Sequence, residues 1–241
     1  MAKHRNTFHL TRFAEEKLCE EQGYRLIAGT DEVGRGCLAG PVVASAVIMP
    51  RDQCPQWYHR VRDSKLLAPE QREELSTYIH EAAVTIGTGA VDSGLIDTLG
   101  MTKAVERAMS IAIDHLQPGP DYVLIDYLTI RGLPLPQKGV ADGDSLCFSI
   151  ACASIVAKVF RDRLMVDQDK KYPGYGFAHH KGYSTEEHVA CLRKLGPSPI
   201  HRRLFSPVKN LAQMNFEDIL STFDGQHSAG QEHRTTEFET E

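Results

Sequence analysis

The sequence predicts an α/β fold in which a central sheet is covered by helices. Three observations support this prediction. Short apolar runs of strand length alternate with longer stretches whose apolar residues recur at helical spacing. Two of the apolar runs lead directly into acidic residues, at Asp31 and at Asp126. Strand patterns come early and helix patterns later, with one strand between helices, an order typical of layered α/β domains.

The first half of the chain is expected to contribute two helices and three strands. Apolar residues lie at helical spacing in residues 8–22, and Gly23 ends that pattern. Residues 25–31 and 41–49 are apolar strands separated by a glycine-rich turn. Residues 69–79 open with a proline and acids, as helices do, and residues 83–91 form the next strand.

The second half predicts long helices around one buried strand. Residues 93–116 are mostly helical, with Gly100 as a place where the helix could divide, and residues 121–126 are a compact strand. Residues 131–143 hold two prolines and three glycines, which favours a loop with room for a short edge strand. In residues 149–171 one helical side is apolar, and the other is expected to carry four charged residues, Lys158, Arg161, Asp162 and Arg163.

The net charge of −5 conceals an uneven distribution. Seven acids and one base follow residue 216, so residues 216–241 are expected to be an acidic, largely disordered tail on a domain of residues 1–215. Residues 153–210 hold eleven Lys and Arg against five acids, which is compatible with a polyanionic partner or an ordinary solvated surface. Six cysteines without a Cys-x-x-Cys pair indicate free thiols in a reducing cytoplasm. No signal peptide or membrane-spanning run occurs, and we expect a monomer.

Acidic residues at strand ends predict a divalent-cation site. Neighbouring residues of a strand point to opposite faces, so Asp31 and Glu32 serve one site only if the backbone bends, which the glycines that follow would permit. Asp126 ends a second apolar strand, and Asp144 lies in the loop before the long helix. Four carboxylates suit Mg²⁺ or Mn²⁺ rather than zinc. They could hold two ions about 4 Å apart, as in phosphoryl hydrolysis.

Several segments, in this order, resemble the ribonuclease HII family. They are residues 29–42 (GTDEVGRGCLAGPV), 63–67 (DSKLL), 149–159 (SIACASIVAKV), 161–163 (RDR), 175–177 (YGF), 180–183 (HKGY) and 201–205 (HRRLF). The resemblance implies a ribonuclease H-like fold, a mixed central sheet flanked by helices, with a helical C-terminal part from about residue 165. Only about 25 residues precede the first expected strand, which favours ribonuclease HII over ribonuclease HIII, whose relatives carry an extra N-terminal domain.

The resemblance also implies roles for single residues. The four acids named above match the catalytic metal ligands of the family. Five further residues match substrate-binding positions, namely Gly34, Arg35 and Gly36 at the ribose 2′-hydroxyl, Lys65 at a backbone phosphate, and Tyr183 against a sugar.

The implied activity is endonucleolytic cleavage of the RNA strand of RNA–DNA hybrids with Mg²⁺ or Mn²⁺, including cleavage 5′ of a single ribonucleotide in duplex DNA. The products would carry 3′-hydroxyl and 5′-phosphate ends. Two alternatives stay open: a non-catalytic hybrid-binding module, and another nuclease of the same fold such as a recombinase or transposase.

Two departures from the family pattern concern the site. Tyr127 follows the third acid where the family usually has glycine, and the family's Lys-Gly-Asp sequence is split, with Lys138 and Gly139 displaced. Asp142 is therefore an alternative to Asp144 as the fourth acid.

Overall fold

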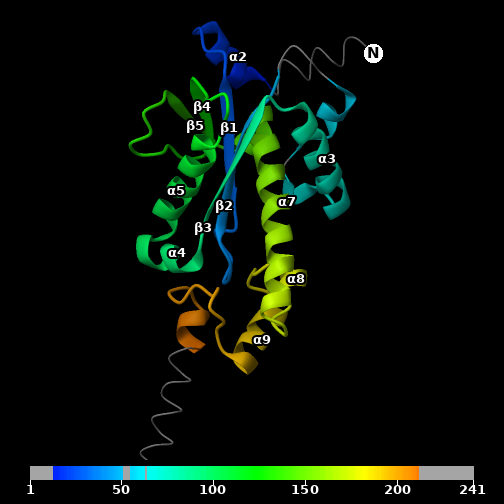
Figure 1. The fold of residues 1–241 in the computed structure, drawn as a ribbon, viewed down its shortest axis with the longest axis vertical. Helices are drawn as coiled ribbons and strands as arrows, with labels where there is room; N and C mark the ends of the chain where they lie inside the picture. Colours follow the sequence, from blue (N-terminus) through cyan, green and yellow to red (C-terminus); the bar gives the residue numbers. More distant parts are fainter. Residues whose placement is uncertain (1–12, 51–54, 63, 212–241) are drawn as a thin grey trace, which may run out of the picture.

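The computed structural model describes residues 13–50, 55–62 and 64–211, and shows helices packed on both faces of a five-stranded sheet (Figure 1). The strand order is β3-β2-β1-β4-β5. The strands are β1 (Ile27–Val33), β2 (Val42–Ile48), β3 (Thr85–Val91), β4 (Tyr122–Asp126) and β5 (Gln137–Val140).

The sheet is mixed, as the sequence predicts. β2 pairs antiparallel with both β1 and β3. A short turn, residues 34–41, connects β1 to β2, whereas the connection from β2 to β3 contains helices. β4 runs parallel to β1, with Thr30 opposite Ile125 as the last pair, and β5 runs parallel to β4. β5 is an edge strand and lies within residues 131–143, the segment expected to be a loop with room for a short edge strand.

Besides a helical stretch at residues 208–211, eight α-helices and two short 3₁₀-helices occur in the described residues. They are α2 (Ala14–Glu21), η1 (Gln56–Arg60), η2 (Ser64–Leu66), α3 (Pro69–Ala82), α4 (Ser93–Leu99), α5 (Met101–Asp114), α6 (Gly143–Leu146), α7 (Phe148–Lys171), α8 (Phe177–His180) and α9 (Glu186–Leu195). Gly100 divides the helix expected over residues 93–116 and has a φ of 80°, a conformation that glycine adopts without a steric penalty.

The hydrophobic core lies in two layers, one on each face of the sheet. On one face, α5 packs its buried side against β1, β2 and β3. On the other face, α7 crosses β1 and β2 and is itself covered by α3 (Figure 1). β1 therefore lies at the centre of the molecule, and this explains why an acidic residue near its end is buried.

α7 differs from the two-sided helix that the sequence predicts. Arg161 was expected on the charged side but is fully buried, whereas the apolar residue before it, Phe160, is 44% exposed. The first half of α7 is buried nearly all round, between the sheet and α3, so the simple division into two sides fails there.

Other expectations lie partly outside the described residues. Four of the six cysteines are buried free thiols, Cys191 is partly buried, and Cys54 lies outside the described residues. The acidic tail expected over residues 216–241 also lies outside them. In the described part of the chain, no helix is both long enough and apolar enough to cross a membrane.

Candidate active site

The acids of β1 and β4 meet because the two strands are parallel. Asp31 follows the last residue pair, Thr30 and Ile125, and Asp126 follows it on β4. Open α/β sheets bind ligands at such carboxyl ends of their strands. The fold therefore brings two acids from distant parts of the sequence to one edge of the sheet.

Glu32 lies in the same site as Asp31, but not because of the backbone bend expected from the sequence. β1 does not stop at Asp31 but continues to Val33, paired with β2. Its other neighbour, β4, ends at Asp126, so the side of β1 that faces away from β2 has no paired strand beside Glu32. The open edge of the strand, rather than a backbone bend between the two acids, gives the Glu32 side chain access to the site.

One cavity of about 280 Å³ brings together every site residue that the sequence predicts. Its lining includes four acids, Asp31, Glu32, Asp126 and Asp144, and five other predicted residues, Gly34, Arg35, Gly36, Lys65 and Tyr183. These residues come from β1, the turn after it, η2, β4, α6 and the loop after α8.

The two candidates for the fourth acid are placed differently. Asp144 lines the cavity and is partly buried, whereas Asp142 is exposed and is not among the lining residues. The N–H of Gly143, between them, donates to Asp126 Oδ1 over 2.8 Å. The geometry thus favours Asp144 as the acid that faces the other three.

Burial and mutual repulsion destabilise the ionised acids. Burial, followed by the charges of Glu32 and Asp126, raises the pKa of Asp31 well above its usual value. Burial also raises the pKa of Glu32, although Arg35, whose Nη1 lies 3.0 Å from Glu32 Oε1, opposes the shift. Burial is again the largest cause of the raised pKa of Asp126. Such a cluster favours any cation that can reach it.

The donor set fits a hard divalent cation. Glu32 Oε2 is buried and accepts no hydrogen bond in the described structure, an arrangement that is costly unless a ligand binds the oxygen. Elsewhere in the described ranges, as at this cavity, no three His, Cys, Asp or Glu side chains form a ready-made chelating cluster. Mg²⁺ does not require one, because it keeps several waters and commonly binds one or two carboxylates together with substrate phosphates.

Three polar residues that the sequence interpretation missed also line the cavity: Ser64, Ser154 and Lys158. A hydrogen bond from Ser154 lowers the pKa of Asp31, and Ser154 Oγ lies 3.0 Å from Ser64 Oγ. Lys158 Nζ lies 2.7 Å from Asp162 Oδ1 and 5.2 Å from the centre of the Tyr183 ring. The sequence spacing could have indicated two of them, because Ser154 and Lys158 are four residues apart on one helix and therefore lie on the same face of it.

Tyr183 is held by the turn that follows β1. Its backbone bridges to Cys37, and the N–H of Leu38 donates to the carbonyl of Gly182 over 2.8 Å. The Tyr183 side chain is 37% exposed, so one side of it is open to a ligand.

Two neutral histidines, linked by a hydrogen bond, bind the backbone carbonyl of Tyr183. His188 Nδ1 donates to the Tyr183 carbonyl over 2.9 Å. Because a neutral imidazole has only one N–H, His188 Nε2 must accept, and this atom lies 3.0 Å from His201 Nε2. His201 Nε2 then donates, and its Nδ1 accepts from the N–H of Ser198 over 2.9 Å. A single set of tautomers therefore satisfies every nitrogen of the two rings. Burial lowers the pKa of His188 to about 4 and that of His201 to about 3, which keeps both rings neutral.

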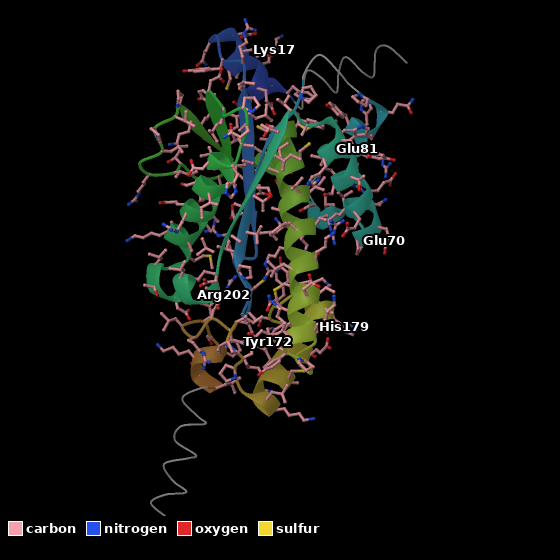
Figure 2. The ribbon with its side chains drawn as sticks, in the orientation of Figure 1. Lys17, Glu70, Glu81, Tyr172, His179 and Arg202 are labelled. Atoms are coloured by element: carbon pink, nitrogen blue, oxygen red, sulfur yellow. The ribbon has the colours of Figure 1, made fainter. Side chains whose placement is uncertain are left out.

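Two neighbouring histidines near Tyr183 differ in burial, and both can be compared with His188, which is fully buried among other rings. His180 is buried, with Nε2 donating to the Tyr175 carbonyl over 2.7 Å. The adjacent His179 is the exposed one and lies beside α7 (Figure 2).

The departure at residue 127 has a conformational basis. Tyr127 has a φ of 63°, in the left-handed region that glycine adopts at least cost, and its side chain is 77% exposed. A glycine would adopt this conformation at less cost than tyrosine, and Tyr127 N–H donates to the carbonyl of Val140 over 2.8 Å. The side chain leaves the cavity and does not obstruct Asp126.

Comparisons with known proteins show the family of this chain and agree with its fold. A family model described as ribonuclease HII matches residues 28–208. A ribonuclease HII of Dehalococcoides mccartyi is 58% identical over 198 residues, which is 82% of this chain and 93% of the relative. The ribonuclease H2 of Pyrococcus horikoshii has a similar structure, with a TM-score of 0.67 at 23% identity over 79% of this chain and 98% of that one. A ribonuclease HIII in complex with Mn²⁺ matches with a TM-score of 0.60 at 19% identity, over 81% of this chain and 71% of that one.

Proposed function

This chain belongs to the ribonuclease HII family, and from that premise we propose that its acidic cavity is the place where the RNA strand is cut. Membership of the family makes the protein a ribonuclease H, an endonuclease that acts on RNA–DNA hybrids. The observation that carries the proposal is the convergence of four acids and five predicted substrate-binding residues on one cavity.

We propose that Asp31, Glu32, Asp126 and Asp144 bind two Mg²⁺ or Mn²⁺ ions. Their raised pKa values and the unpartnered Glu32 Oε2 support this assignment, because both are relieved by a cation. When bound, such ions would activate a water and stabilise the departing 3′-oxygen, leaving 3′-hydroxyl and 5′-phosphate ends.

The remaining lining residues would bind and orient the substrate. Lys65 lies close enough to Asp126 to lower its pKa and is well placed to neutralise a backbone phosphate. Tyr183 would pack against a sugar with its exposed side, while Lys158 and Asp162 form an ion pair beside it. No base-reading module is visible in the sequence, so recognition is proposed to follow sugar and backbone shape.

The proposed substrates include a duplex with a single embedded ribonucleotide, cut on its 5′ side. The turn of Gly34, Arg35 and Gly36 would detect the 2′-hydroxyl, the atom that distinguishes RNA from DNA. The monomeric state, the cytoplasmic location and the domain boundary near residue 215 stay predictions.

The test is cleavage of an end-labelled DNA duplex containing one ribonucleotide, with Mg²⁺, Mn²⁺ or EDTA. We expect a cut 5′ of the ribonucleotide with either metal, none with EDTA, and none in an all-DNA duplex. Asp31→Asn should abolish cleavage and preserve hybrid binding, whereas exposed Asp142→Asn should cut normally. Binding of the duplex without cleavage would favour the non-catalytic alternative, and cleavage of the all-DNA duplex would favour a different nuclease. An inactive Asp142→Asn protein would mean that Asp142, and not Asp144, is the fourth acid.

A further inference from the structure

Two buried arginines hold the turn between β1 and β2. All hydrogen bonds from the Arg202 guanidinium go to backbone carbonyls of this turn: Nη2 to Gly34 at 2.7 Å, Nη1 to Arg35 at 2.8 Å, and Nε to Gly40 at 3.1 Å. Arg202 is fully buried, where the C-terminal segment meets the end of β1 and β2 (Figure 2). Burial lowers its pKa only to about 10, so the group stays charged at neutral pH.

Arg161 joins the other end of the turn to the loop that carries Tyr183. Its Nε donates to the Pro41 carbonyl over 3.0 Å, and its Nη1 donates to the Lys181 carbonyl over 2.9 Å. A Cβ at Gly34 would lie 2.3 Å from Arg161 Nε, and Gly34 also has a φ of 94°, so this glycine is required by packing and by backbone conformation.

The carbonyl contacts of Arg202 fix the direction of two N–H groups. In a planar trans peptide, the carbonyl oxygen and the following N–H point in opposite directions. With the Gly34 and Arg35 carbonyls turned toward Arg202, the N–H groups of Arg35 and Gly36 point away from it. Gly34, Arg35 and Gly36 line the acidic cavity, whereas Arg202 does not, so these N–H groups lie on the cavity side. Within the part of the chain that the structure describes, neither N–H has a hydrogen-bond partner.

Gly36 gives independent evidence that this side of the turn is kept open. Its φ is outside the left-handed region, and a Cβ placed on it would meet no atom within 4 Å. Neither backbone strain nor internal packing therefore requires glycine at this position. Close approach of a ligand to the backbone is the remaining physical use of a glycine here.

We propose that Arg202 is a positioning residue for ribose recognition, because it orients the Arg35 and Gly36 N–H groups as preformed donors to a 2′-hydroxyl. This inference rests on the proposed function. Arg202 does not touch the substrate itself; it acts through the two carbonyls that it binds. Deoxyribose offers no acceptor at that position, so a correctly held turn favours ribonucleotide-containing duplexes.

The test measures ribose preference in binding rather than activity alone. Fluorescence anisotropy in EDTA gives the affinity for a duplex with one ribonucleotide and for the same duplex made only of DNA. We expect the wild-type protein to prefer the ribonucleotide, and Arg202→Lys, which keeps the charge but loses the planar fork, to lower that preference about tenfold. Arg203→Lys is the matched control, since Arg203 is adjacent and exposed and should keep the wild-type preference.

Gly36→Ala examines the other half of the proposal. The added methyl meets nothing in the protein, so the melting temperature should not change, but it would obstruct approach to the N–H groups and lower the ribose preference. A folded Arg202→Lys or Gly36→Ala protein with wild-type preference would overturn the proposal. If both Arg202→Lys and Arg202→Gln fail to fold, Arg202 is structural and the proposal is likewise overturned. A wild-type protein that leaves ribonucleotide duplexes uncut would instead refute the proposed function.

Discussion

Replacing Gly29 with alanine should disrupt both stability and catalysis, because β1 and α7 touch at this residue. A Cβ on Gly29 would lie 2.3 Å from the backbone N of Ile150 and from the backbone C of Ser149. Ordinary contact begins at 3.4 Å, so the strand and the helix must separate by about 1.1 Å. The atoms that must move are backbone atoms in the first turn of α7, so no flexible side chain can absorb the displacement.

The expected magnitudes follow from that displacement. Overpacking against backbone in a close-packed core should cost about 3 kcal/mol of the free energy of unfolding. For a domain of this size the melting temperature would fall by about 6–12 °C. α7 also carries Ser154 and Lys158 into the cavity, and a shift of about 1 Å in catalytic geometry can cost about 100-fold in rate.

Thermal unfolding and cleavage rates on a ribonucleotide-containing duplex measure the two effects. Gly119→Ala is the matched control, since a Cβ there meets nothing within 4 Å and Gly119 is outside the left-handed region. A Gly29→Ala protein that melts within about 2 °C of the wild-type protein, less than the shift expected from 1 kcal/mol, would show that the close contact is not costly. A stable variant would mean that α7 is free to slide on β1.

Two further predictions concern ionisation. Because burial and like charges raise the pKa of Asp31, its ionised form destabilises the fold at pH 7, so Asp31→Asn in EDTA should gain about 1 kcal/mol in unfolding free energy. This gain in unfolding free energy should vanish as the pH falls toward 3.8, the usual pKa of aspartate, because Asp31 then becomes protonated in both states. Mn²⁺ should raise the melting temperature of the wild-type protein but not that of the variant. An Asp31→Asn protein less stable than the wild type at pH 7 would contradict this expectation. The lowered pKa values of His188 and His201 mean that the unfolded chain binds more protons below pH 6.5, so stability should fall from pH 6.5 to pH 5. His201→Gln should flatten that slope in melting temperatures measured across this range, and an unchanged slope would assign it to other groups.

The sequence predicts the fold well where local pattern and long-range packing agree. The ends of β1, β2, β3 and β4 were expected within two residues of where they are observed. The break at Gly100 is where it was expected, and the edge strand β5 lies within the segment that left room for one. The prediction failed on α7, because helical periodicity cannot show that a helix is covered from two directions. Arg161 is the clearest case, since a charged residue is assigned to solvent unless its carbonyl partners, distant in sequence, are known.

The candidate site was predicted from residues that share a strand-end pattern or a family motif, and all nine of these residues line one cavity. Ser64 and Ser154 were missed because each is chemically unremarkable until it is brought beside Asp31. The histidine chain was missed for a related reason. His188 and His201 are 13 residues apart, and only the fold shows that one tautomeric arrangement links them to Tyr183.

The span of α7 has an evolutionary consequence. One uninterrupted helix presents Ser154 to an acid, Lys158 to the Tyr183 ring and Arg161 to three carbonyls. Each residue of an α-helix is rotated by about 100° from the one before it, so a single insertion between these positions would turn the later ones off target. Length variation among relatives should therefore collect in surface connections such as residues 131–136, while the angular phase of this helix is inherited unchanged.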